Sequence, residues 1–123
     1  MRIGVIGLGK LGLPVALAIE SKKHTVYGYD INNKVIGFIK KRKIPYKEKG
    51  IKKLLENTKI KILSEKEILK KSELIFLAIQ TPHEKKYEGV TKIPKTKKDF
   101  DYKYIINSIK NLSKAVNQLK IKK

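Results

Sequence analysis

Short apolar runs alternate with amphipathic segments along this chain, which is the pattern of strands and helices that follow one another in turn. The runs typical of strands cover residues 2–6, 25–29, 59–63 and 74–79. The segments typical of helices cover residues 11–23, 33–41, 51–57 and 64–72, and a last helix begins near Asp101. This alternation predicts an α/β fold with right-handed crossovers and a parallel sheet in the strand order 3-2-1-4.

Local signals refine several of these elements. Ser64, with Glu67 three residues later, forms the pattern of a capping box at a helix start, and Asp101 is a plausible N-cap for the last helix. That helix carries an apolar stripe of Ile105, Ile109, Leu112, Val116 and Leu119. The continuous apolar run of residues 74–79 predicts the most buried strand, covered on both faces. Residues 83–100 are polar and aperiodic, which predicts a long loop of functional or disordered character.

The most informative motif is a glycine turn between the first strand and the first helix. Gly7-Leu8-Gly9-Lys10-Leu11-Gly12 fits the pattern G-x-G-x-x-G, and Pro14 falls in the first turn of the following helix, where it is tolerated. The first glycine allows a tight turn, the second lets the backbone approach a pyrophosphate, and the third lets the helix pack closely on the sheet. The helix N-terminus then presents free N–H groups to phosphates.

An acidic residue completes this motif at the end of the second predicted strand. Asp30 follows Gly12 by 18 residues, and a dinucleotide-binding unit places its ribose-binding carboxylate roughly 20 residues on. A carboxylate there accepts hydrogen bonds from ribose hydroxyls and repels a 2′-phosphate, so the predicted cofactor is NAD rather than NADP. Lys34 lies close enough to soften that preference. The alternative interpretation is a βαβ unit that binds no ligand.

Composition narrows the choice of function. The net charge of +19 leaves open a basic protein that binds nucleic acid. Against this, the lysines are spread along the chain, only Arg2 and Arg42 are arginines, and the dense cluster 40–43 is more typical of a solvated helix end. The chain has no cysteine and no apolar run of 18 residues, so we expect no disulfide, no zinc–thiolate site, no membrane span and a cytoplasmic location. Glu84 and Glu88 are weak candidates for metal ligands, and no metal site is predicted.

With these features in place, the chain resembles the N-terminal portion of the UDP-glucose/GDP-mannose dehydrogenase family, and most of all its UDP-glucose 6-dehydrogenases. The resemblance rests on four blocks, which are Ile3–Pro14, Tyr29–Asn32 with Lys34, Ile44–Ile51 and Phe76–Pro82. It covers the whole chain and implies a Rossmann-like fold with NAD as cofactor. The extended segment that contains Tyr87-Glu88-Gly89 is similar to one subgroup of the family.

The resemblance also implies roles for individual residues. Thr81 would approach the nicotinamide ribose, Lys34 would join Asp30 at the adenosine ribose, and Leu11 would contact NAD through its backbone. Lys10 and Leu11 stand where the commonest family turn has Tyr-Val, and Lys10 is expected to support phosphate binding. The full set of expected cofactor-binding residues is Gly7, Leu8, Gly9, Lys10, Leu11, Gly12, Asp30, Lys34 and Thr81.

The implied reaction is the oxidation of a UDP-sugar, UDP-glucose to UDP-glucuronate first among them, as a step toward polysaccharide. Family members use a cysteine nucleophile, a lysine and a sugar-binding domain; the chain has no cysteine, and the lysine and that domain lie beyond residue 123. We therefore expect residues 1–123 to be an incomplete Rossmann domain, truncated before strands five and six and inactive alone. It would bind NAD and associate with a complementary chain or with itself. The alternative is a stand-alone NAD-binding or regulatory module.

Overall fold

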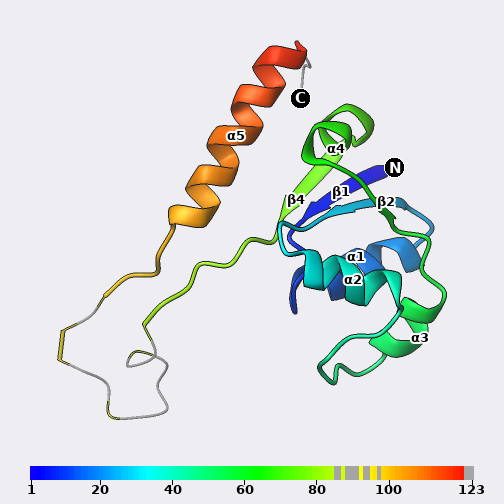
Figure 1. The fold of residues 1–123 in the computed structure, drawn as a ribbon, viewed down its shortest axis with the longest axis horizontal. Helices are drawn as coiled ribbons and strands as arrows, with labels where there is room; N and C mark the ends of the chain where they lie inside the picture. The colour runs from blue at the N-terminus through cyan, green and yellow to red at the C-terminus, as the bar shows by residue number, and fades with distance from the viewer. Residues whose placement is uncertain (85–86, 88–91, 93–94, 97, 121–123) are drawn as a thin grey trace.

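The computed structural model describes residues 1–84, 87, 92, 95–96 and 98–120. The described residues form one sheet of four parallel strands in the order β3-β2-β1-β4, which confirms the predicted order (Figure 1). The strands are β1 (Arg2–Ile6), β2 (Thr25–Tyr29), β3 (Lys61–Ile62) and β4 (Leu74–Leu77). The first two match the predicted bounds, whereas β3 and β4 are shorter than predicted because only these residues pair with their neighbours.

Five helices connect and follow the strands among the described residues. They are α1 (Gly12–Ser21), α2 (Asn33–Lys40), α3 (Ile51–Glu56), α4 (Glu65–Lys71) and α5 (Lys103–Leu119). Each lies within one or two residues of its predicted bounds. The capping box at the start of α4 is confirmed, since the Ser64 side chain accepts from the Glu67 N–H and the Glu67 carboxylate accepts from the Ser64 N–H.

The main core lies between one face of the sheet and helices α1, α2 and α3. Val5 and Val26 contribute from the strands, and Leu17, Ile39 and Leu55 contribute from the three helices. On the other face, α4 packs close to β1. A Cβ added to Gly4 would lie 2.4 Å from Cγ2 of Ile68, so this glycine permits the close approach of α4.

The fourth strand is not the most buried one, and that prediction is wrong. Leu74 and Phe76 are 44% and 42% exposed, and β4 pairs only with β1. The run has apolar residues on both faces of the strand, but β4 lies at the edge of this sheet, and β1 is its one pairing partner in the described part of the chain. The edge position itself agrees with the predicted order.

Helix α5 lies beside α4 and away from the main core (Figure 1). None of residues 103–119 is buried, and Ile106 and Ile109 are 46% and 49% exposed. The predicted N-cap is off by one residue: Tyr102 occupies the N-cap position, and Asp101 accepts a hydrogen bond from the Lys103 N–H from one residue further out. Among the residues that the structure describes, no helix is long and apolar enough to cross a membrane.

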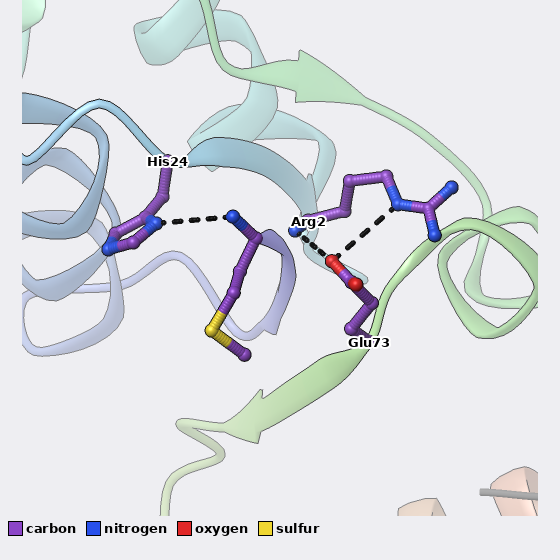
Figure 2. Close-up of polar contacts among 4 residues, drawn as sticks. Arg2, His24 and Glu73 are labelled. Carbon is purple, nitrogen blue, oxygen red and sulfur yellow. Dashed lines mark hydrogen bonds and ion pairs between the residues drawn. The ribbon is translucent and has the colours of Figure 1, made fainter.

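A polar contact holds the starting ends of β1 and β4 together. The Glu73 carboxylate accepts from the backbone N–H of Arg2 at 2.6 Å and lies 3.7 Å from the Arg2 Nε (Figure 2). The Glu73 N–H in turn donates to the Arg2 carbonyl at 2.8 Å. His24 lies nearby, in the turn before β2, with its Nδ1 3.5 Å from the N-terminal nitrogen (Figure 2).

Candidate functional site

The glycine turn leaves the carboxyl end of β1 in a conformation that requires its first and third glycines. Gly7 has a φ of +93°, and its N–H donates to the Tyr29 carbonyl at 2.8 Å. A Cβ on Gly7 would lie 2.4 Å from the Ala78 carbonyl oxygen, and one on Gly12 would lie 1.8 Å from the Gly7 carbonyl oxygen. These clashes with backbone explain why neither position accepts a side chain.

The second glycine differs from the other two because it borders open space. A Cβ added to Gly9 would meet no atom of a described residue within 4 Å. Its carbonyl accepts from the Leu13 N–H at 3.0 Å, which places Gly9 at the amino end of α1. No side chain of the described residues caps this helix at Leu11. A ligand phosphate can therefore approach the Gly9 backbone at the amino end of α1, where the helix dipole favours negative charge.

The carboxylate of Asp30 lies against this turn, at the end of β2. Its Oδ2 accepts from the Leu8 N–H at 2.7 Å, and its Oδ1 accepts from the Asn32 N–H at 2.7 Å. Each oxygen keeps a second lone pair for an incoming donor, because a carboxylate has about four acceptor sites. The side chain is thus oriented by two backbone bonds and retains the capacity to accept from ribose hydroxyls.

The other predicted residues fall around the same end of the sheet. Leu8 is buried in the core and offers a ligand only its backbone, whereas Leu11 is 72% exposed. Lys34 is exposed in the first turn of α2, where its N–H donates to the Asn32 side chain. Thr81 follows β4 by four residues and is half-buried. The structure thus brings Thr81 and Asp30 to the carboxyl ends of β4 and β2, on either side of β1.

A small cavity of about 180 Å³ adjoins the glycine turn. Gly9, Lys10, Phe38, Tyr46 and Gln80 are among the residues that line it. The Lys10 Nζ lies over the Tyr46 ring, 5.9 Å from its centroid, which is within cation–π range. Residue-level reasoning did not single out Phe38, Tyr46 or Gln80. For Tyr46 and Gln80 the sequence did contain a signal, since both fall within blocks that carried the family resemblance. Phe38 lies in none of these blocks.

Of the two weak metal-ligand candidates, Glu84 and Glu88, the second lies outside the described residues. Within the described part of the chain, no three His, Cys, Asp or Glu side chains lie together as metal ligands. His83, which follows Thr81 and Pro82, packs edge-on against Phe100 with ring centroids 5.4 Å apart. Residues 88–89 of the segment that resembles a family subgroup are also outside the described residues.

Comparison with known proteins decides the family. Residues 1–121 match the NAD-binding domain of the UDP-glucose/GDP-mannose dehydrogenase family. The chain belongs to this family. NAD is accordingly the cofactor of this domain, and the open backbone at Gly9 together with the oriented carboxylate of Asp30 fits that dinucleotide.

Relatives of this dehydrogenase domain are known from bacteria and archaea. It is 37% identical over 86 residues to UDP-N-acetyl-D-mannosamine dehydrogenase of Pyrococcus horikoshii, which covers 67% of the chain and 21% of the relative. It is 42% identical over 83 residues to Protein CapL of Staphylococcus aureus, covering 68% and 19%. A ternary complex of Pseudomonas aeruginosa GDP-mannose dehydrogenase superposes with a TM-score of 0.76 at 26% identity, covering 94% of the chain and 25% of that structure. The dehydrogenase domain therefore spans about a fifth to a quarter of the length of these relatives.

Proposed function

We propose that this chain binds NAD at the carboxyl ends of β1, β2 and β4 and presents it to a nucleotide-sugar dehydrogenase reaction. The observation that carries the proposal is the Asp30 carboxylate, fixed by the Leu8 N–H at 2.7 Å beside a turn whose middle glycine borders open space. In open α/β sheets, ligands bind where neighbouring connections leave in opposite directions. That point lies here between β1 and β4, as the order β3-β2-β1-β4 requires.

Each part of the dinucleotide has proposed partners. Gly7, Gly9 and Gly12 shape the turn, while the backbone from Leu8 to Leu11 and the ammonium of Lys10 hold the pyrophosphate. Asp30 and Lys34 hold the adenosine ribose, and Thr81 approaches the nicotinamide ribose. NAD supplies a hydride acceptor when bound. The protein groups orient it, and the negative charge of Asp30 disfavours the 2′-phosphate of NADP.

A direct titration tests this binding site. NAD⁺ and NADP⁺ are titrated separately into the purified chain by isothermal calorimetry. The proposal expects one site for NAD⁺ and a dissociation constant for NADP⁺ that is larger by about 10-fold or more, the equivalent of one repulsive charge contact. Equal affinity for the two dinucleotides would show that Asp30 does not contact the adenosine ribose. If neither dinucleotide released or absorbed heat, the proposed site would be refuted.

We further propose that the alcohol oxidised is the primary hydroxyl of a UDP-linked sugar, with UDP-glucose as the first substrate to test. The resemblance of Phe76–Pro82 and Ile44–Ile51 to UDP-glucose 6-dehydrogenases supports UDP-glucose. The relative from P. horikoshii, a UDP-N-acetyl-D-mannosamine dehydrogenase, supports a UDP-linked sugar and supplies the second substrate to test. The chain has no cysteine, so the thiol that the family reaction uses must come from another polypeptide segment.

The identity of the sugar is tested with the protein purified from its own cells, so that any polypeptide bound to it is purified with it. NADH absorbance is followed with UDP-glucose or UDP-N-acetylmannosamine as substrate. NADH formation with UDP-glucose alone supports the proposal, and formation with UDP-N-acetylmannosamine alone reassigns the sugar. A chimera in which residues 1–121 replace the matching domain of the P. horikoshii relative tests separately whether this domain serves a dehydrogenase.

We also propose that the edge of β4 and the apolar stripe of α5 are covered by a fifth parallel strand in the assembled dehydrogenase. A complete sheet of this type continues from strand four to strands five and six. Leu74 and Phe76 on β4 and Ile109 on α5 are 44%, 42% and 49% exposed, so both elements present large apolar side chains to solvent. The net charge of +19 opposes a second copy of the chain as the covering element.

A further inference from the structure

A second and larger cavity lies next to the one at the glycine turn and has a different character. Its volume is about 710 Å³, within the roughly 300–1,000 Å³ typical of small-molecule sites. It shares Ile44 and Tyr46 with the first cavity, and these two residues form its apolar wall. No residue predicted to bind the cofactor lines it.

The rim of this basic cavity is strongly cationic. Five of its nine lining residues are basic, compared with 30 of 123 in the whole chain, and Glu48 is the one acidic residue among the nine. The basic residues are Arg42, Lys43, Lys47, Lys49 and Lys52. A concave surface lined this way concentrates positive potential and attracts small anions. The enrichment exceeds what the lysine-rich composition alone produces.

One of these cations is held rigidly in place. The Arg42 Nη1 donates to the carbonyls of Leu55, Glu56 and Thr58 at 3.0, 2.7 and 3.0 Å. These carbonyls lie at the C-terminal end of α3, where helix carbonyls lack partners within the helix. Arg42 itself has a φ of +55°, a conformation that non-glycine residues seldom adopt. The guanidinium therefore stays beside the cavity, and its other nitrogens make no hydrogen bond to a described residue.

The wall shared by the two cavities contains an unsatisfied group. The Tyr46 hydroxyl is buried and has no hydrogen-bond partner among the described residues. Burial, and to a lesser degree the nearby Glu48 carboxylate, raises the pKa of Tyr46, so the phenol stays protonated and keeps its donor. A buried donor without an acceptor costs free energy. A small rearrangement of this wall that lets a ligand acceptor reach the hydroxyl would remove that cost.

We propose that the basic cavity is a second binding site, separate from the NAD site, for a nucleoside polyphosphate. The fixed guanidinium of Arg42 suits bidentate contact with a phosphate, and the lysines neutralise further phosphate charge. The apolar surface of Ile44 and Tyr46 suits a base. The concave shape and limited volume favour a small nucleotide over a nucleic-acid strand, which would need an extended basic groove.

The test measures binding of ATP and of inorganic tripolyphosphate to the isotope-labelled chain by NMR titration. The cavity variant combines Lys47→Gln with Lys52→Gln. The matched control combines Lys110→Gln with Lys114→Gln on α5, which removes the same charge elsewhere. The proposal expects ATP to shift amide signals of residues 42–55, and the cavity variant to weaken ATP binding by about 10-fold or more, with less than about 2-fold loss in the control.

Further arms separate this site from the alternatives. An Asp30→Ala variant should bind ATP as the wild type does. Loss of ATP binding in this variant would place ATP in the dinucleotide site and overturn the proposal. Tripolyphosphate should bind more weakly than ATP, and equal binding would show that the apolar wall takes no part. Equal losses of ATP affinity in the cavity and control variants would indicate a general polycation and overturn the proposal. The same conclusion would follow if an oligonucleotide displaced ATP and both variants weakened the binding of that oligonucleotide equally. The NAD⁺ titration has its own readout, so either proposal can fail alone.

Discussion

The backbone N–H of Leu8 donates to Oδ2 of Asp30 at 2.7 Å, and this contact joins the glycine turn to the end of β2. The second oxygen of the same carboxylate accepts from the Asn32 N–H. One side chain therefore fixes two loops that approach from different strands, and it does so at the place where the ribose of NAD is proposed to bind. Asp30 is both a structural connection and a ligand contact.

A neutral replacement should change the choice of dinucleotide more than the fold. Asp30→Asn keeps an amide oxygen that can accept one of the two backbone bonds, but it removes the charge that repels a 2′-phosphate. We expect the preference for NAD⁺ over NADP⁺ to fall by about 10-fold, measured as the ratio of the two dissociation constants. An unchanged ratio would show that charge at this position does not select the dinucleotide.

The three glycines of the turn should separate into two classes. Gly12→Ala puts a Cβ 1.8 Å from the Gly7 carbonyl oxygen, so the chain must shift its backbone and should lose several degrees or more of melting temperature. Gly9→Ala meets no atom within 4 Å and should melt within a few degrees of the wild type.

The same pair of variants should differ in the opposite sense in ligand binding. Gly9→Ala fills the space proposed for the pyrophosphate, so a variant that folds normally should bind NAD⁺ more weakly by about 10-fold or more. Circular dichroism melts followed by NAD⁺ titration check both halves. Full NAD⁺ affinity in a folded Gly9→Ala variant would place the phosphates elsewhere.

The capping box at the start of α4 should make stability depend on pH. Hydrogen bonds from the Ser64 N–H and hydroxyl hold the pKa of Glu67 below its ordinary value of 4.5. Since the folded-state pKa is the lower one, the stabilisation is present above the unfolded pKa and is lost as pH falls through the folded pKa. The melting-temperature difference between wild type and Glu67→Gln should be present at neutral pH and vanish in acid. A difference that persists in acid would assign it to packing instead.

The exposed edge of β4 should promote self-association when salt screens the net charge of +19. Phe76→Lys places a charge on this edge, which is how natural sheets protect unpaired strands. Light scattering at high ionic strength should therefore decrease in this variant. Ile31→Lys is the control, because it adds the same charge at a residue that is 88% exposed and off the sheet edge. Equal reductions in both variants would assign the effect to net charge.

Much of this architecture is predictable because strong local patterns and topology agree. The motif from Gly7 to Gly12 and the apolar runs of β1 and β2 each have one interpretation in an α/β unit, and the strand order follows from connection rules. The capping box of Ser64 and Glu67 is equally local. These elements depend on neighbours in sequence, so the sequence contains their determinants.

The wrong prediction concerns the burial of the fourth strand, and the packing around the site was not predicted, because both depend on distant contacts. The run of residues 74–79 has the same composition whether a strand lies on both sides of β4 or on one, so its exposure could not be read from periodicity. Likewise, the packing of Tyr46 beside Lys10, and of Arg42 against the end of α3, depends on how residues 42–50 fold back. Local sequence patterns do not determine how this segment folds back.

The measurement that tests the central claim most directly is a thermal melt of the chain with and without NAD⁺, in wild type, Asp30→Ala and Glu56→Ala. Glu56→Ala removes an equal charge at an exposed site on α3. NAD⁺ at roughly 100 times its dissociation constant should stabilise the wild type and the control by about 2.7 kcal/mol, with little effect on Asp30→Ala. A cooperative melt that NAD⁺ leaves unmoved in the wild type, or raises equally in all three proteins, would contradict the proposed site.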